Sequence, residues 1–176
     1  MELLGWFPRL KRFGGVVAVD AVTLVAEKPN EITTEGGLDV KANISIVRAA
    51  VAKLRQGNIL TSLFIDPDPA QIEVAHEVGA QQVELCTAAY AEATLGARGI
   101  HGEGAAHAAQ ELRRLREGAE LATQYGLNVA AGHGLTYRNV VAVAAIKKIT
   151  EFNIGHNIVS RAIFVGLENA VREMRA

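Results

Sequence analysis

Two histidines follow predicted strands in this sequence, and each has a glycine beside it. Residues 131–137 read Ala-Gly-His-Gly-Leu-Thr-Tyr after the apolar run Leu127–Ala130, so His133 lies between two glycines. Residues 152–156 read Phe-Asn-Ile-Gly-His and lead into a helical pattern that begins at Asn157. Glycine lets the backbone approach a ligand, and unpaired N–H groups at a helix start favour an anion. Taken singly, either histidine is equally well explained as a structural residue at a strand end, with its hydrogen bonds made within the protein. Together, the two histidines predict a phosphate site.

A carboxylate and a hydroxyl pair are the other candidates for chemistry. Glu84 lies inside the apolar run Gln82–Thr87, where an unpaired carboxylate is costly to bury, so it needs a polar partner or a chemical role. Thr33 belongs to the polar loop 27–37, which is rich in groups that could face a ligand. Two alternatives stay open: Glu84 as a structural partner of a polar neighbour, and Thr33 as a turn residue. No spacing of His, Cys or Asp indicates a metal site.

Alternating strand and helix patterns must position these residues. Strands are predicted at Val16–Ala26, Leu60–Ile65, Gln82–Thr87, Asn128–Ala131 and Glu151–Ile154. A helix follows each strand; Asp68-Pro69 predicts one helix start, with Asp68 at the N-cap. A single last helix is expected to carry Phe164, Leu167, Val171 and Met174 on one face. The Gly-rich stretch 96–104, which contains His101, is expected to be a loop able to act as a lid.

This alternation predicts an α/β fold with a parallel sheet and right-handed crossovers. A small doubly wound sheet would gather its ligand groups at one switch point. Here polar or Gly-rich residues follow every predicted strand, which favours a (β/α) barrel with ligand groups at the carboxyl ends of its strands. A closed barrel needs eight strands, so the sequence predicts an incomplete barrel of about five βα units.

Composition limits the class of protein. The chain has 176 residues, of which 49% are hydrophobic and 21% charged, with a net charge of −1 and one cysteine, Cys86. These values predict an ordered domain, no nucleic-acid partner, no membrane span and a reducing cytoplasm. The arginines of the long predicted helix, Arg113, Arg114 and Arg116, are expected on a solvated face rather than in an anion site.

Several runs resemble the pyridoxine 5'-phosphate synthase family. The resemblance covers residues 20–176 in order, and residues 1–19 are left unassigned. The matching runs are Asp20–Val25, Thr33–Asp39, Ser62–Asp66, Val83–Leu85, Ala131–Val140 and Asn153–His156. The family is a (β/α)8 barrel that forms homo-octamers, and the matching runs correspond to its strands four to eight.

The resemblance implies a reaction and a set of roles. The family condenses 3-amino-2-oxopropyl phosphate with 1-deoxyxylulose 5-phosphate, closes the pyridine ring of vitamin B6, and needs no cofactor or metal. The resemblance implies that His133 donates a proton and that Gly134, Gly155 and His156 hold the amino-ketone phosphate. It also implies that Thr33 binds the deoxyxylulose phosphate and that Glu84 stabilises a transition state.

Some family motifs have no counterpart in this sequence. The Asn-x-Asp-His run, the His-x-Arg run and the glutamate of the family's first three strands are absent from it. We therefore expect a truncated synthase chain that is inactive alone. Two alternatives stay open: a non-catalytic, phosphate-binding partner subunit of an oligomer, and a different sugar-phosphate isomerase or lyase that uses His133 and Glu84.

Overall fold

The computed structural model describes residues 19–26, 36–96 and 103–176. Thr33 and His101 lie outside these ranges. The strands are β1 (Ala21–Leu24), β2 (Leu60–Ile65), β3 (Gln82–Cys86), β4 (Asn128–Gly132) and β5 (Glu151–Asn153). The helices are α2 (Ile44–Gln56), α3 (Pro69–Glu77), α4 (Ala88–Gly96), α5 (Glu103–Gln124), α6 (Val140–Ala144), α7 (His156–Val165) and α8 (Leu167–Arg175).

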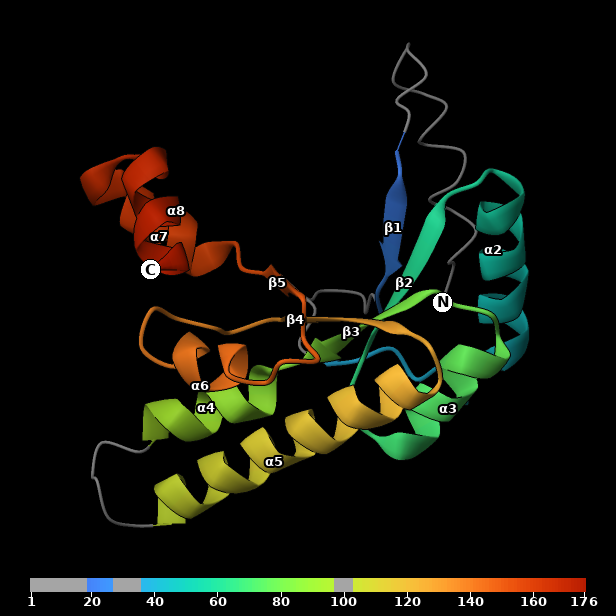
Figure 1. Cartoon of the computed structure of the whole chain (residues 1–176), viewed down its shortest axis with the longest axis horizontal. Coiled ribbons are helices and arrows are strands. Elements are labelled where there is room, and N and C mark those ends of the chain that lie inside the picture. Colours follow the sequence, from blue (N-terminus) through green and yellow to red (C-terminus); the bar gives the residue numbers. More distant parts are fainter. Residues whose placement is uncertain (1–18, 27–35, 97–102) are drawn as a thin grey trace.

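The five strands form one parallel sheet in the order β1-β2-β3-β4-β5. Each strand pairs only with its neighbours in the chain, and no strand order reverses as it does in a doubly wound sheet. Within the described residues the ring is not closed, so β1 and β5 are the two edges of a half-barrel (Figure 1). The prediction of an α/β fold with an incomplete set of parallel strands is confirmed.

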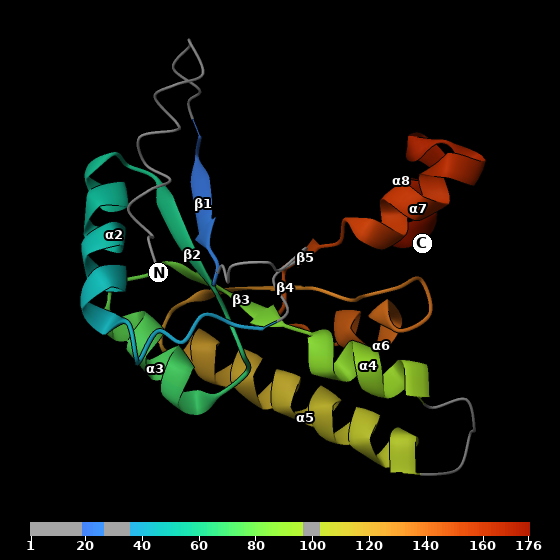
Figure 2. The ribbon, with the colours of Figure 1, turned by 180° about the vertical axis from the view of Figure 1, so that it is seen from behind.

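Alternate residues of the strands face two different environments. The outward row is apolar and wholly buried, and it includes Leu63, Ile65, Val83 and Leu85. It belongs to one core with the buried faces of α2, α3 and α5, which cover this side of the sheet (Figures 1 and 2). The register pairs Ser62 with Gln82 and Phe64 with Glu84, so these four residues share the opposite, inner face.

Local sequence explains where several helices begin and end. The Asp68 side chain accepts a hydrogen bond of 2.7 Å from the backbone N–H of Ala70, and Pro69 is the first residue of α3. This confirms the predicted cap, because Asp accepts from an orphan donor and Pro needs none. In α2, Val47, Val51 and Leu54 are buried, as their spacing predicts, and Gly57 ends the helix.

Two parts of the helical layer differ from the sequence prediction. The last helix is not continuous: Gly166, with φ 80°, separates α7 from α8, since this backbone conformation is not helical and favours glycine. Helix α4 was not predicted, because its Ala-rich sequence has almost no amphipathic period. The predicted lid loop has residues 97–102 outside the described ranges, and α5 already begins at Glu103.

Helices α7 and α8 lie apart from the other helices, beyond β5 (Figure 1). The Arg161 guanidinium joins them through two hydrogen bonds to the Glu173 carboxylate, of 2.7 and 3.1 Å. The Tyr137 hydroxyl donates to the backbone carbonyl of Ala170, 3.0 Å away, and links α8 to the loop after β4. Large apolar side chains of α7 and α8 remain exposed, including Ile163 and Phe164.

Candidate functional site

The candidate site lies at the carboxyl ends of β3, β4 and β5. These strands are neighbours in the sheet and parallel, so their carboxyl ends meet at one edge. Glu84 belongs to β3, His133 and Gly134 follow β4, and Gly155 and His156 follow β5. The fold therefore brings five of the six predicted site residues to one side of the half-barrel; Thr33 is not described.

Glu84 is buried on the inner face and is held by a strand that is not its neighbour. Its exposed fraction is 8%, and Oε2 accepts a hydrogen bond of 2.7 Å from Nδ2 of Asn153 on β5. Burial raises the pKa of Glu84, the hydrogen bond from Asn153 opposes that rise, and the nearby Glu151 carboxylate adds to it. A carboxyl group with a raised pKa keeps its proton to higher pH, which suits a group that donates a proton.

Gly132 makes this contact across β4 possible. A Cβ atom at Gly132 would collide with Oε1 of Glu84 and would lie within 2.9 Å of the backbone oxygen of Asn153. Glycine is therefore required here by close approach and not by backbone conformation. Because Gly132 has no side chain, Asn153 on β5 can reach past β4 and donate its hydrogen bond to Glu84 on β3.

His133 adopts an unusual backbone conformation directly after β4. Its φ is 83° and that of Gly134 is 72°, and among the described residues other than glycine only Asn58 shares a positive φ with it. A histidine in this region is strained, and such residues occur mostly at functional sites. A Cβ atom at Gly134 would lie 2.7 Å from the Cβ of Ala91, so α4 packs directly on this turn.

Thr87 holds the strained turn in place. Its hydroxyl lies 2.8 Å from the carbonyl oxygen of Gly132 and 2.5 Å from that of His133, and its backbone N–H also donates to Gly132. The His133 ring is half-buried, and its centroid is 6.3 Å from that of Phe64, an inner-face residue of β2. The imidazole therefore lies on the same side of the sheet as Glu84.

The loop between His133 and α6 is fixed by Asn139. Its Oδ1 accepts from the backbone N–H of Thr136 at 2.7 Å, and its own N–H donates to the Thr136 hydroxyl at 3.3 Å. Asn139 also contacts α4, because its carbonyl accepts from the Tyr90 hydroxyl and its amide donates to Thr94. These bonds make the loop after β4 a rigid support for the imidazole.

Gly155 and His156 form the exposed start of α7. The first hydrogen bond of the helix runs from the N–H of Val159 to the carbonyl of Gly155, which leaves the N–H groups of the first turn unpaired. No atom of the described residues lies within 4 Å of a Cβ built at Gly155, so within that part of the chain the space beside these donors is open. The His156 side chain makes no hydrogen bond with the described residues, and it can add a donor for an anion.

Two further groups line the carboxyl ends of β2 and β3. Burial raises the pKa of the Cys86 thiol to about 11, with a smaller contribution from the Asp66 carboxylate. Asp66 also accepts a hydrogen bond of 3.2 Å from the N–H of Gly37, where the chain returns toward α2. In the described residues no three His, Cys, Asp or Glu side chains are arranged to hold a metal ion.

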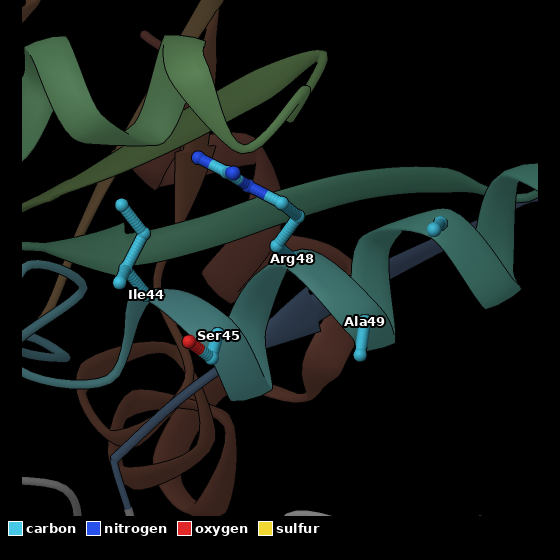
Figure 3. A pocket seen from close by; sticks show the side chains of 5 residues that line it. Ile44, Ser45, Arg48 and Ala49 are labelled. Atoms are coloured by element: carbon cyan, nitrogen blue, oxygen red, sulfur yellow. The ribbon is translucent and has the colours of Figure 1, made fainter.

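A pocket of about 370 Å³ lies elsewhere, on α2. It is lined by Ile44, Ser45, Arg48, Ala49 and Ala52, with no residue from the candidate site (Figure 3). Its lining has one charged side chain, Arg48. The buried carboxyl group of Glu84 and the histidine with positive φ both lie at the half-barrel edge instead.

Sequence reasoning missed three residues that shape this site. They are Thr87, Gly132 and Asn153. Asn153 and Gly132 belong to runs already singled out for their histidines, but nothing in the sequence pairs Asn153 with Glu84. Thr87 is the last residue of the predicted strand Gln82–Thr87 and directly follows the observed β3, where the carboxyl end of a barrel strand carries functional groups.

The fold and site define a class of protein: an α/β half-barrel whose strand ends carry a buried carboxyl group, a histidine and an exposed helix start. The model of the pyridoxal phosphate biosynthesis protein PdxJ matches residues 9–176. The chain therefore belongs to the PdxJ family. The match includes residues 9–19, which precede the first motif recognised in the sequence.

Curated relatives agree with this assignment. The chain is 53% identical over 159 residues to a pyridoxine 5'-phosphate synthase of Synechococcus sp. (strain JA-2-3B'a(2-13)), a match that covers 90% of this chain and 63% of that protein. It is 47% identical over 158 residues to the enzyme of the same name from Geotalea uraniireducens (strain Rf4), covering 90% and 62%. The chain thus spans less than two thirds of the length of these relatives.

One solved structure supports the fold alone. The crystal structure of the Amycolatopsis orientalis BexX/CysO complex superposes with a TM-score of 0.54 at 17% identity, covering 96% of this chain and 59% of that one. This likeness is consistent with an α/β half-barrel that matches part of a larger fold.

Proposed function

We propose that this chain carries part of the active site of a pyridoxine 5'-phosphate synthase, a transferase. The reaction would join 3-amino-2-oxopropyl phosphate to 1-deoxyxylulose 5-phosphate and close the pyridine ring. The observation that supports this most is the meeting of Glu84, His133 and the start of α7 at neighbouring strand ends. Ring closure by successive condensations needs several proton transfers and a hold on each phosphate, and these groups supply both.

His133 would act as the proton donor. An imidazole can both donate and accept a proton, and the backbone of this one is fixed by Thr87 and by the rigid loop that follows. Glu84 would stabilise charge in the transition state from the inner face. Its burial supports this role, because electrostatic interactions are stronger where water is excluded.

The phosphate of the amino-ketone would bind between Gly134, Gly155 and His156. The unpaired N–H groups of the first turn of α7 and the helix dipole both favour an anion there. Thr33, outside the described residues, would bind the phosphate of the deoxyxylulose substrate. We expect no cofactor, because the imine would form between the two substrates.

Binding of 3-amino-2-oxopropyl phosphate, measured by calorimetry, tests the phosphate site. His156→Ala is expected to weaken binding about tenfold or more, since a charge-assisted hydrogen bond contributes roughly 1.5–3 kcal/mol. His107→Ala is the matched control, because His107 is an exposed histidine on α5. Equal affinity of the wild type and His156→Ala would contradict this site.

Turnover tests the reaction itself. We expect the chain alone to form no pyridoxine 5'-phosphate from the two substrates, because the family's acid–base motifs of the first three strands are absent from its sequence. Loss of one proton-transfer group lowers a rate by roughly 10²–10⁴-fold. Ring closure by the purified chain would show that the groups on β3 to β5 suffice.

A second candidate function is a non-catalytic, phosphate-binding subunit of an oligomer. In the part of the chain that the structure describes, β1 and β5 each pair on one side only, and unpaired strand edges favour association. If the chain instead functions as a pyridoxine 5'-phosphate synthase, we also propose that it forms a homo-oligomer. A monodisperse monomer in gel filtration that binds no full-length synthase would exclude the partner role.

We place the protein in the cytoplasm as part of the same proposal. None of the helices that the structure describes combines the length and the apolar character needed to cross a bilayer.

A further inference from the structure

The hydrogen bond from Asn153 to Glu84 links two strands that are separated by a third. We infer that Asn153 is a positioning residue: through the gap at Gly132 it holds Oε2 of Glu84 and leaves Oε1 as the oxygen that faces the substrate and stabilises its charge. This inference deepens the proposed function and rests on it for the identity of the substrate.

Geometry supports a fixed carboxylate. Oε2 lies 2.7 Å from Nδ2 of Asn153, while Oε1 lies against Gly132 and has no hydrogen-bond partner among the described residues. A carboxylate held by one oxygen through a neighbouring strand cannot turn about its last bond without losing that hydrogen bond. Its two oxygens are therefore not equivalent.

The donor also decides which oxygen carries the proton. Oε2 already accepts an N–H with one of its two lone pairs, whereas both lone pairs of Oε1 are free among the described residues, so we expect a proton added to the carboxylate on Oε1. Protonated Oε1 can donate to a ligand in the half-barrel, and ionised Oε1 can accept from one. Asn153 thus gives Glu84 a single working oxygen.

The charged surroundings make this neutral donor important. Three ionisable groups lie on the same side of the sheet as Glu84: Glu151 on β5, whose charge opposes ionisation, Cys86 on the same face of β3, and His133 after β4. Asp66, which follows β2, raises the pKa of the Cys86 thiol. Gln82 lies 3.4 Å from Glu151 through Nε2, so the inner face continues as a row of amides and carboxylates. Within this described set Asn153 is the group that favours the ionised form of Glu84.

The test is the titration of Glu84 in the full chain without substrate, followed by ¹³C NMR of its side-chain carboxyl carbon. Asn153→Ala removes the donor and is expected to raise the midpoint above that of the wild type. Asn153→Asp keeps the shape but adds a like charge, and it is expected to raise the midpoint further. Asn128→Ala is the matched control: Asn128 lies at the start of β4, and no bond joins its side chain to Glu84.

An unchanged or lowered midpoint in Asn153→Ala would overturn the inference. A lowered midpoint would mean that protonated Oε2 donates to the amide oxygen, so that Oε2 carries the proton. If Asn153→Ala does not fold, the midpoint of Asn153→Asp decides the test alone, because the aspartate side chain has the same shape as that of asparagine. The titration uses no substrate. An unchanged midpoint would therefore overturn the role of Asn153 while the proposed function stands, and a raised midpoint would support that role even if the chain acts on other substrates.

Discussion

The two faces of the half-barrel are built from alternate residues of the same strands and do different work. On β3, Val83 and Leu85 are wholly buried against the helices, whereas Glu84 between them is buried among polar groups. The outer face stabilises the fold through apolar burial, and the inner face holds a carboxylate whose ionisation costs free energy. The residues that stabilise the fold and those of the proposed site are thus separated by one residue step along a strand.

The largest expected difference between the faces comes from Leu85→Ala. Leu85 has an exposed fraction of 0%, so the change leaves a cavity in the outer core and should lower the free energy of unfolding by about 2–5 kcal/mol. Denaturant unfolding measures this loss. Glu84→Gln, one residue away on the inner face, is the matched control and should lose much less. Equal losses would break the comparison.

Gly132→Ala should have the next largest effect, because it closes the gap between β3 and β5. The added methyl group meets Oε1 of Glu84 and the backbone of Asn153, and we expect a cost of about 1–3 kcal/mol from overpacking. Gly155→Ala is the control, since none of the described residues has an atom within 4 Å of a Cβ built there. Chemical denaturation of both variants tests this, and equal stability would contradict the role of the gap.

Thr87→Val should cost about 1 kcal/mol. Valine keeps the shape but removes the hydroxyl that reaches the carbonyl groups of Gly132 and His133. Thr123→Val is a suitable control, because the hydroxyl of Thr123 bonds only within its own helix, to Ala119. Urea unfolding gives the costs, and NMR of the His133 ring should show a change in Thr87→Val alone.

The smallest effect is the pH dependence that Glu84 gives to stability. Burial raises its pKa above the ordinary 4.5, so the folded chain binds more protons than the unfolded chain. The stabilisation of the folded state by this extra proton is complete below pH 4.5. It is lost as the pH rises through the raised pKa of Glu84. Stability of the wild type should therefore fall over this interval relative to Glu84→Gln, as followed by thermal unfolding against pH. Parallel profiles would show that the carboxylate is not desolvated.

The sequence predicted the strands better than the contacts between them. Continuous apolar runs located β2 and β3, and Asp68-Pro69 located the start of α3, because these signals are local. The bond from Asn153 to Glu84 joins residues far apart in the chain, and it depends on the register of three strands. No period or cap encodes such a contact.

The same limit explains the remaining differences. The Ala-rich α4 gives no period, so its packing on Gly134 and its bond to Asn139 appear only in three dimensions. The apolar spacing through Phe164 and Leu167 predicted one helix, although Gly166 between them takes a positive φ. The roles of His133 and Glu84 came from the family resemblance, and their placement on one side of the sheet fits those roles.

The sequential strand order also bears on how the chain folds. Each strand pairs with the one just before it in the chain, with only a helical crossover of one or two helices between them. The loops that must close are therefore short, and their entropy cost grows only slowly with length. A pairing nucleus at β2 and β3 can be extended strand by strand in either direction, and during synthesis the later strands can dock in the order in which they leave the ribosome.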